Sequence, residues 1–218
     1  MAESITITIS VLALAVSLIT AWLTLFHRGT VRMTQPTVIF LGPDGSSSSE
    51  VIRAPKIYIR TLLFATSKRG RVVESMHVRV ARNESKQNFN IWVYGDDKLV
   101  RGSGLFVGET GVSANHHFLT PKDAGEFRFA EGEYTLEVFA TLLGEPSARC
   151  LWSQKIQISR EQAAALQNSK AGLYFDWGPD SGRYIPHIEE RPPTPHVDDL
   201  LKILGIDRGT SKGKREKV

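Results

Sequence analysis

The N-terminal run over residues 5–26 constrains the fold most, because its 22 residues include no charged residue, glycine or proline. As an α-helix it would be about 33 Å long, which matches a bilayer hydrocarbon core of about 30 Å. Its serine and threonine hydroxyls can donate to carbonyls one turn back, so they do not prevent insertion. The run predicts a single transmembrane helix over residues 5–26, in contact with the lipid bilayer, after a short stub over residues 1–4.

A cleaved signal peptide is the alternative interpretation of this segment. Such a peptide needs a positively charged start, an apolar stretch of about 7–15 residues and small residues at the cleavage site. The chain begins Met-Ala-Glu-Ser, without Lys or Arg, and the longer apolar run ends in Leu25-Phe26-His27-Arg28. These departures favour a membrane anchor.

The charges beside the helix predict its orientation. No Lys or Arg precedes it, whereas Arg28 and Arg32 follow it closely. The positive-inside rule therefore predicts that the C-terminal domain is cytoplasmic. The single Cys150 cannot form an internal disulfide, which is also typical of a reducing compartment.

After a juxtamembrane linker over residues 27–36, short alternating apolar runs are separated by turn residues, which is typical of β-strands. About seven such runs predict a β-sandwich domain over residues 37–159. The runs are residues 37–41, 56–66, 71–82, 88–94, 99–107, 132–140 and 151–158. The second and third runs flank Ser67-Lys68-Arg69-Gly70, and this turn predicts that they form a hairpin.

One strand carries a more specific pattern. Gly132-Glu133-Tyr134-Thr135-Leu136-Glu137-Val138 resembles the penultimate strand of immunoglobulin-like and fibronectin-like domains, with Tyr134 at the corner position. The predicted fold class is therefore an all-β sandwich of the immunoglobulin-like or fibronectin-like kind, with an N-terminal transmembrane helix and short C-terminal helices.

The C-terminal third is predicted in two parts. Ser159-Arg160-Glu161-Gln162 has capping-box spacing, so residues 160–194 are expected to hold a short helix followed by an extended strap over the domain. Residues 195–218 are expected to hold an amphipathic helix over 197–204 and a disordered basic tail.

Three segments carry a family resemblance. They are Arg60-Thr-Leu-Leu-Phe-Ala-Thr-Ser-Lys-Arg-Gly70, Asn90-Ile-Trp-Val-Tyr-Gly-Asp-Asp97 and Asn115-His-His-Phe118. Over most of residues 30–160 the chain resembles an uncharacterised bacterial family of small single-pass membrane-anchored proteins with a β-rich soluble domain. The resemblance implies a bacterial origin and membrane anchoring, and it supplies no site residues. With the charge argument it implies location in the bacterial inner (plasma) membrane.

Catalytic patterns are weak. The glycine-rich stretch Gly102-x-Gly104-x-x-x-Gly108-x-x-Gly111 matches neither the dinucleotide nor the phosphate-binding motif, and we expect a mobile loop between strands. His116 and His117 are adjacent on a predicted strand, so they should point to opposite faces and not share a metal ion. We predict no catalytic residue, no metal ligand and no cofactor.

The leading hypothesis is a membrane-tethered, non-enzymatic interaction module that presents loops and the C-terminal helix to a protein partner. The candidate partner surface comprises Trp92, Tyr94, His116, His117, Trp177, Leu200, Leu201 and Leu204. Cations of the tail are candidates for contact with anionic lipid, with a merely solvating tail or nonspecific nucleic-acid contact as the alternatives. These cations are Arg208, Lys212, Lys214, Arg215 and Lys217.

Two alternative functions remain open at this point. One is a membrane-bound hydrolase or metal-dependent enzyme that uses His116 or His117. The other is binding of an envelope glycan by a set of aromatic side chains, if the domain is periplasmic. These side chains are Trp92, Tyr94, Trp152 and Trp177.

Overall fold

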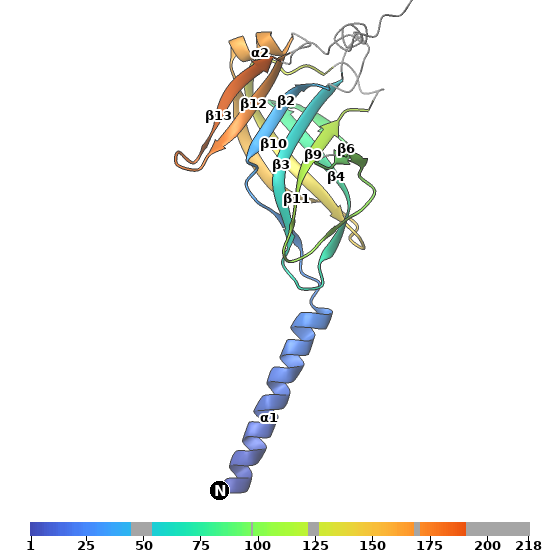
Figure 1. Cartoon of the computed structure of the whole chain (residues 1–218), viewed down its shortest axis with the longest axis vertical. Coiled ribbons are helices and arrows are strands. Elements are labelled where there is room, and N and C mark those ends of the chain that lie inside the picture. Colours follow the sequence, from blue (N-terminus) through green and yellow to red (C-terminus); the bar gives the residue numbers. More distant parts are fainter. Residues whose placement is uncertain (45–53, 97, 122–126, 168–170, 191–218) are drawn as a thin grey trace, which may run out of the picture.

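The chain begins with a long helix that projects from a β-rich body. The computed structural model describes residues 1–44, 54–96, 98–121, 127–167 and 171–190. Helix α1 (Ala2–Ala21) continues into a π-helical turn, η1 (Trp22–Phe26), and none of its residues is buried. Its length and apolar composition are sufficient to cross a membrane. Figure 1 shows it as a stalk beneath the body.

The hydroxyl groups in this helix behave as predicted. Six serine and threonine side chains each donate to the carbonyl oxygen four residues earlier, at distances of 2.8–3.0 Å. The polar atoms are therefore satisfied within the helix itself.

The body contains thirteen strands and one short helix among the described residues. The strands are β1 (Val31–Met33), β2 (Val38–Pro43), β3 (Pro55–Ala65), β4 (Arg71–Arg82), β5 (Ser85–Phe89), β6 (Ile91–Tyr94), β7 (Val100–Arg101), β8 (Leu105–Val107), β9 (Val112–Leu119), β10 (Gly132–Leu142), β11 (Arg149–Ile158), β12 (Ala171–Gly178) and β13 (Arg183–Glu190). Helix α2 (Arg160–Leu166) follows β11 and begins with a capping box between Ser159 and Gln162.

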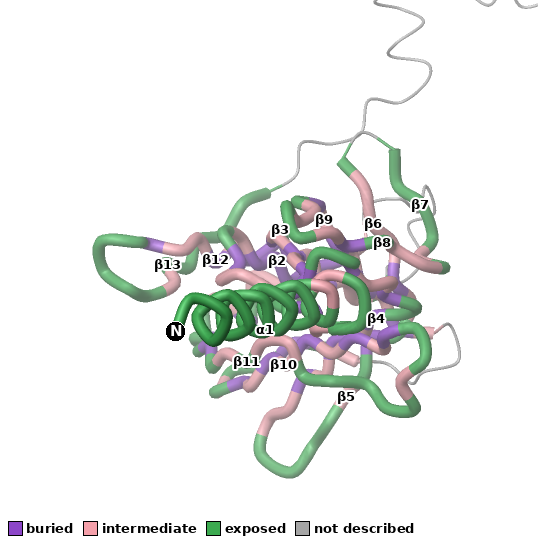
Figure 2. The backbone as a smooth tube through the Cα atoms, turned by 90° about the horizontal axis from the view of Figure 1, so that it is seen from below, coloured by how far each residue is buried: buried purple, intermediate pink, exposed green. Residues whose placement is uncertain are grey.

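The strands form two antiparallel sheets. Sheet A has eight strands in the order β13-β12-β2-β3-β9-β6-β7, with β1 also paired to β3. Sheet B has five strands in the order β11-β10-β4-β5, with β8 also paired to β4. Figure 2, which looks along α1, shows the two sheets as stacked layers.

The core lies between these layers because alternate residues of each strand point inward. In β10 every second residue from Tyr134 to Leu142 is buried. Ile57, Ile59 and Leu63 of β3 meet this surface from sheet A, and all three are at most 1% exposed. The body is therefore a two-layer β-sandwich.

The connection from the helix to the sandwich is short and is held in place by hydrogen bonds. Only four residues separate Phe26 from Val31, and their backbone is bonded to the turn between β3 and β4. The Ser67 hydroxyl donates to the Arg28 carbonyl at 2.8 Å, and Thr66 and Thr30 exchange backbone and side-chain hydrogen bonds. Gly29 has φ +59°, and a Cβ there would lie 2.7 Å from Ser67 Cβ. This end of the sandwich, which we call the helix-proximal end, is thus fixed by the helix.

Tyr134 makes the contact expected of a corner tyrosine. Its hydroxyl donates to the Ala130 carbonyl at 2.9 Å and accepts from the Ala130 amide at 2.8 Å. The ring is 2% exposed, and the Arg82 guanidinium lies 5.8 Å from its centroid. One side chain therefore ties the start of β10 to the preceding loop.

The predicted hairpin of residues 56–66 with 71–82 is wrong. Strand β3 pairs with β1, β2 and β9, whereas β4 pairs with β5, β8 and β10. The turn after β3 carries the chain across the core from sheet A to sheet B. The two strands face each other across the core. Apolar residues alternate in the same way whether two strands pair in one sheet or lie opposite each other in two sheets, so the sequence pattern does not distinguish these arrangements.

Three boundaries also need correction. The linker over 27–36 contains strand β1, and the predicted strand over 88–94 is divided at Asn90 into β5 of sheet B and β6 of sheet A. The predicted strap after α2 is wrong, because β12 and β13 form a hairpin whose first strand pairs with β2. The sandwich therefore extends beyond residue 159 to Glu190. The expected helix over 197–204 and the tail lie outside the described residues.

Substituting Tyr134→Phe should reduce the free energy of unfolding by about 1–2 kcal/mol, because the amide and carbonyl of Ala130 lose their part-buried hydrogen bonds to the Tyr134 hydroxyl. Urea denaturation of the full chain in detergent measures the change. Tyr94→Phe is the comparison, since that half-buried hydroxyl makes one bond, to the Gly104 carbonyl, and its loss should cost less. Equal losses in the two variants would contradict the role given to the Tyr134 contact.

Candidate functional site

A row of aromatic side chains crosses the outer face of sheet A. The residues paired in register from one strand to the next are His187 of β13, Tyr174 of β12, Phe40 of β2, Tyr58 of β3 and His117 of β9. We call these five residues the outer aromatic row. Val93 of β6 and Arg101 of β7 continue the same register to the edge of the sheet.

The rings of the row contact one another in two groups. The centroid of Tyr174 lies 5.3 Å from His187 and 4.9 Å from Phe40. The rings of Tyr58 and His117 lie 5.0 Å apart. Such spacings are those of favourable aromatic pairs. The outer face of an antiparallel sheet is more often polar, so a row of rings there is unusual.

Two glycines allow Phe40 to lie flat on the sheet. A Cβ on Gly172 would be 2.1 Å from the Phe40 ring, and one on Gly42 would be 2.7 Å from it. Phe40 is only 3% exposed and yet is not part of the core between the sheets. The two glycines therefore leave the space in which the Phe40 ring, in the middle of the row, lies against the sheet.

Polar groups flank the row. The Tyr58 hydroxyl donates to the Asn115 side chain at 2.8 Å, and burial raises the pKa of Tyr58. Burial and then the Lys56 ammonium lower the pKa of His117 to about 4, so its imidazole is neutral at pH 7. Its Nδ1 atom is buried and has no hydrogen-bond partner in the described part of the chain. The row thus presents neutral rings with a few polar atoms.

His116 points the other way, into the core. It is 1% exposed, and the Trp92 indole donates to its Nδ1 atom at 3.2 Å. The His116 and Phe118 ring centroids are 6.5 Å apart. Burial lowers the pKa of His116 to about 4, so the neutral ring acts as the acceptor for Trp92. His116 is therefore a core histidine.

The structure separates the residues of the predicted partner surface. Trp92 is 3% exposed and His116 is buried, so the prediction that they lie on a partner surface was wrong. Tyr94 is half-buried on the same inner side and bonds the Gly104 carbonyl. Only His117 of these predicted residues lies in the outer aromatic row. Leu200, Leu201 and Leu204 and the five cations of the tail lie outside the described residues.

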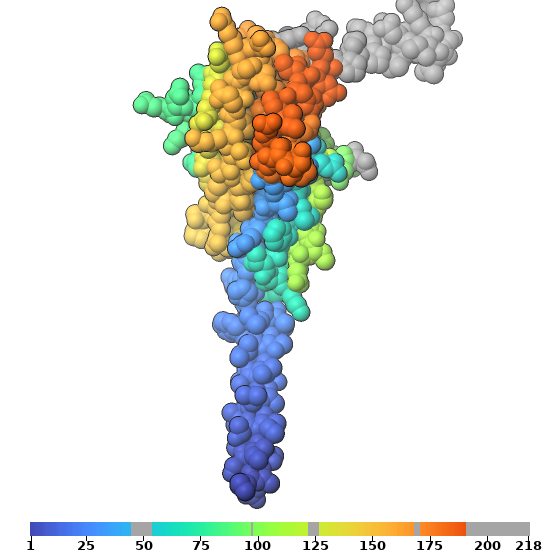
Figure 3. Space-filling model, turned by 90° about the vertical axis from the view of Figure 1, so that its left-hand side faces the viewer, coloured from blue at the N-terminus to red at the C-terminus, as the bar shows by residue number. Residues whose placement is uncertain are grey.

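Trp177 belongs to a separate cluster where the two sheets meet. Its ring lies 5.1 Å from Tyr184, and Tyr184 lies 6.5 Å from Trp152 of sheet B. Gln35 accepts from the Trp152 indole at 3.1 Å and donates to the Tyr184 hydroxyl at 3.0 Å. Figure 3 shows the orange-red β12–β13 hairpin beside the lighter orange strands of sheet B. These contacts tie β13 of sheet A to β11 of sheet B.

This arrangement separates the four aromatic residues considered for glycan binding. Trp92 and Tyr94 lie on the inner side of sheet A, whereas Trp152 and Trp177 lie at the edge that joins the sheets. They do not form one surface. A glycan site made of these four residues is therefore excluded.

The histidine pair also behaves as predicted. His116 faces the core beside Ile59, and His117 faces outward beside Tyr58, so they cannot bind one metal ion together. Among the residues that the structure describes, no group of three or more His, Cys, Asp or Glu side chains is placed to hold a metal ion. The geometry gives no support to a hydrolase or metal enzyme built on this pair.

The residues missed from the sequence are Phe40, Tyr58, Tyr174 and His187. Each occupies the outward position of its strand, where a polar residue is the more common choice. The signal was present in strand β3, where Tyr58 lies between the inward Ile57 and Ile59. Its partners could not be identified without the register of the sheet.

Comparisons with known proteins identify no relative by sequence. No family model matches the chain, and no curated protein matches it. Among solved structures it is similar to the CooA pilin subunit from enterotoxigenic Escherichia coli, at 12% sequence identity and a TM-score of 0.27. The match covers 55% of this chain and 95% of that chain. At this TM-score the likeness carries no argument about fold or function.

The stability of the sandwich should fall in mild acid because of His116. Folding lowers the pKa of His116 from 6.5 to about 4, so between these pH values the unfolded chain is protonated at His116 and the folded chain is not. The free energy of unfolding is therefore unaffected by His116 above about pH 6.5. It falls by an amount on the order of 3 kcal/mol as the pH is lowered to about 4.

Urea denaturation of the full chain at a series of pH values measures this dependence. His116→Gln should remove about half of the dependence, because the pKa of His117 is lowered to a similar value and His117 contributes the other half. His27→Gln, at an exposed position beside α1, is the matched control. An unaltered slope in His116→Gln would show that His116 is not the group responsible.

Proposed function

We propose that α1 anchors the chain in a lipid bilayer and that the β-sandwich is a non-enzymatic module that binds a protein partner. The observation that carries the binding role is the outer aromatic row, five side chains in register across five strands of one sheet. The partner lies over this row, and Tyr58 and His117 form its half-exposed end on β3 and β9.

The anchoring proposal is supported by the helix itself. Its apolar side chains are exposed along its whole length, with Ile5, Leu12 and Leu18 each at least 60% exposed. In water such a surface is unfavourable by about 25 cal/mol per Å², whereas in a bilayer it is solvated by lipid. We place the chain in a bacterial inner membrane as a single-pass protein, with the sandwich on the cytoplasmic side.

A protein partner fits the chemistry of the row. Interface centres are enriched in aromatic side chains and depleted in charged ones, with charged residues at the rim. Here the charged Lys56–Asp44 pair, with its atoms 3.3 Å apart, lies near His117 at the side of the row. An enzyme would need convergent reactive groups, and the row presents neutral rings.

The finer fold class belongs to the same proposal. We assign the sandwich to the immunoglobulin-like or fibronectin-like kind on the strength of Tyr134, whose hydroxyl bonds the backbone four residues upstream as a corner tyrosine does. The segment over 195–218 supplies two further contacts: Leu200, Leu201 and Leu204 with the partner, and the tail cations with anionic lipid.

The orientation can be measured with the native thiol. Cys150 is the single cysteine and is exposed, so a membrane-impermeant maleimide reports its side of the membrane. Partial burial raises the pKa of its thiol, so the reaction should be run at mildly alkaline pH, where more thiolate is present. In spheroplasts we expect labelling only after permeabilisation.

The control for accessibility is Lys86→Cys in a Cys150→Ser background, because Lys86 is exposed at the other end of the sandwich. The two positions should label alike. Labelling of both in intact spheroplasts would contradict the cytoplasmic orientation. Release of the chain from membranes by alkaline carbonate would contradict the anchor.

The docking face can be tested by photo-crosslinking in cells. A benzoyl-phenylalanine in place of Tyr58 should form an adduct of discrete higher mass, since position 58 lies within the row between Phe40 and His117 and is half-buried. The matched position is Gln157, exposed on the outer face of sheet B, which should give no such adduct. Absence of an adduct at position 58, or the same adducts at both positions, would contradict the proposal.

A further inference from the structure

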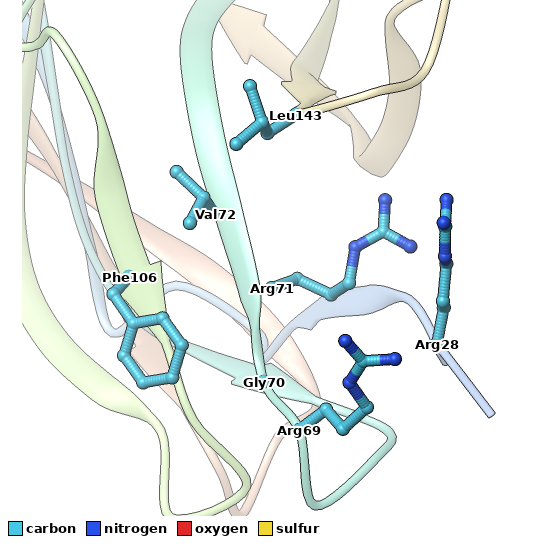
Figure 4. A pocket seen from close by; sticks show the side chains of 7 residues that line it. All are labelled: Arg28, Arg69, Gly70, Arg71, Val72, Phe106 and Leu143. Atoms are coloured by element: carbon cyan, nitrogen blue, oxygen red, sulfur yellow. The ribbon is translucent and has the colours of Figure 1, made fainter. Parts of the chain in front are cut away.

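A hollow at the helix-proximal end of the sandwich is lined by three arginines. Arg28 follows the helix, Arg69 lies in the turn between β3 and β4, and Arg71 is the first residue of β4. On the other side the hollow is lined by Val72, Phe106 and Leu143. Figure 4 shows the three guanidinium groups gathered on one side and the apolar side chains on the other. The hollow has a volume of about 340 Å³ and opens to solvent.

The arginines keep donors available for a ligand. Arg71 is braced, because it donates to the Gly29 carbonyl at 3.2 Å and pairs with Glu145 at 2.8 Å. Arg69 donates to the Leu25 carbonyl at 2.8 Å, which satisfies an end of the helix, and its other N–H groups remain. For the Arg28 side chain the described residues provide no hydrogen-bond partner. Two guanidinium groups can therefore bind an anion beside a third that is fixed.

Positive charge predominates at this end of the molecule. Six basic side chains, on the residues next to the helix and on the adjoining strands and turns, face three carboxylates. The basic residues are Arg28, Arg32, Lys68, Arg69, Arg71 and Arg149, and the acidic ones are Glu74, Glu109 and Glu145. Glu145 is already engaged by both Arg71 and Arg149. An anion in the hollow would therefore meet an excess of positive charge.

Two large apolar side chains beside the arginines are exposed. Phe106 and Leu143 are each 60% exposed, and the Phe106 ring lies against Gly70, where a Cβ would be 2.5 Å from it. Exposed apolar groups next to cations are typical of surfaces that contact the interfacial layer of a membrane. The chemistry of the hollow thus matches a charged headgroup above acyl chains.

The position of the hollow beside the helix indicates which kind of anion it binds. Arg28 is two residues beyond the end of η1, and the connection is pinned to the turn that carries Arg69. This step rests on the proposed function: if α1 spans a bilayer, the hollow lies at the level of the lipid headgroups. We propose that it binds the phosphate group of an anionic phospholipid, and that this contact holds the helix-proximal end of the sandwich against the membrane.

The test uses the full chain in vesicles of phosphatidylcholine, with or without phosphatidylglycerol. A fluorophore at Thr110→Cys in a Cys150→Ser background lies at the same end but outside the hollow, on the exposed turn before β9. Its quenching by a lipid that carries a headgroup nitroxide reports how close this end lies to the membrane. We expect stronger quenching with phosphatidylglycerol, and loss of this increase at high salt.

The decisive variant is Arg28→Gln with Arg69→Gln, which leaves the braced Arg71 in place and should abolish the increase. The matched control is Lys86→Gln with Arg160→Gln, which removes the same charge from exposed positions away from the hollow and should retain it. An increase that survives in the Arg28/Arg69 variant, or no increase in the wild-type chain, would overturn the hollow as a lipid site.

Failure of the anchor gives a different result. If the wild-type chain does not float with the vesicles after alkaline carbonate treatment, the anchoring proposal fails and this inference fails with it. If the chain floats but quenching is the same in both vesicle types, the anchor stands and only the lipid site is overturned.

Discussion

The four-residue connection between helix and sandwich is the constraint on which the rest of the structure depends. A flexible linker would let the domain take any orientation, whereas here both the Arg28 carbonyl and Thr30 are bonded to the turn after β3. Gly29 is required because its positive φ and the closeness of Ser67 leave no space for a side chain. If α1 spans a bilayer, as proposed, the direction of the helix decides which end of the sandwich faces the membrane and which faces remain for partners.

The two surfaces described above follow from this geometry. The arginine hollow lies at the end where the helix enters, whereas the outer aromatic row runs across sheet A, at right angles to its strands. A domain held at its end on a bilayer would leave this face of sheet A to the side. Lipid contact and partner binding would then use different surfaces and would not compete.

The sequence predicted well those features that depend on neighbouring residues. An uncharged run of 22 residues identifies an apolar helix, and alternation placed the strand around Tyr134 within two residues of its observed bounds. The bond from the Tyr134 hydroxyl to Ala130 spans four residues and is likewise local. These features need no knowledge of the fold.

The features that were missed depend on contacts between distant segments. At Asn90 the chain passes from sheet B to sheet A, so Phe89 and Trp92 both point inward although they are an odd number of residues apart. Alternation counted from Phe89 through a single strand would place Trp92 on the outer face, whereas it is buried. An extended strap was predicted after the short helix within residues 160–194, but this segment forms the β12–β13 hairpin, and Pro186 lies in the edge strand β13, where proline is tolerated. The outer aromatic row combines five strands, and only the register of the sheet brings its members together.

The central claim is that the sandwich is held rigidly at the end of the helix, and the distance between two spin labels tests it most directly. One label replaces Thr8 in α1, and the other replaces Glu84 at the exposed β4–β5 turn, in a Cys150→Ser chain reconstituted in bilayers. The account predicts one narrow distribution of distances by pulsed electron paramagnetic resonance, which broadens when Gly29 is replaced by valine. A broad distribution in the chain with Gly29 intact would show that the domain moves freely on its tether, and would contradict the account.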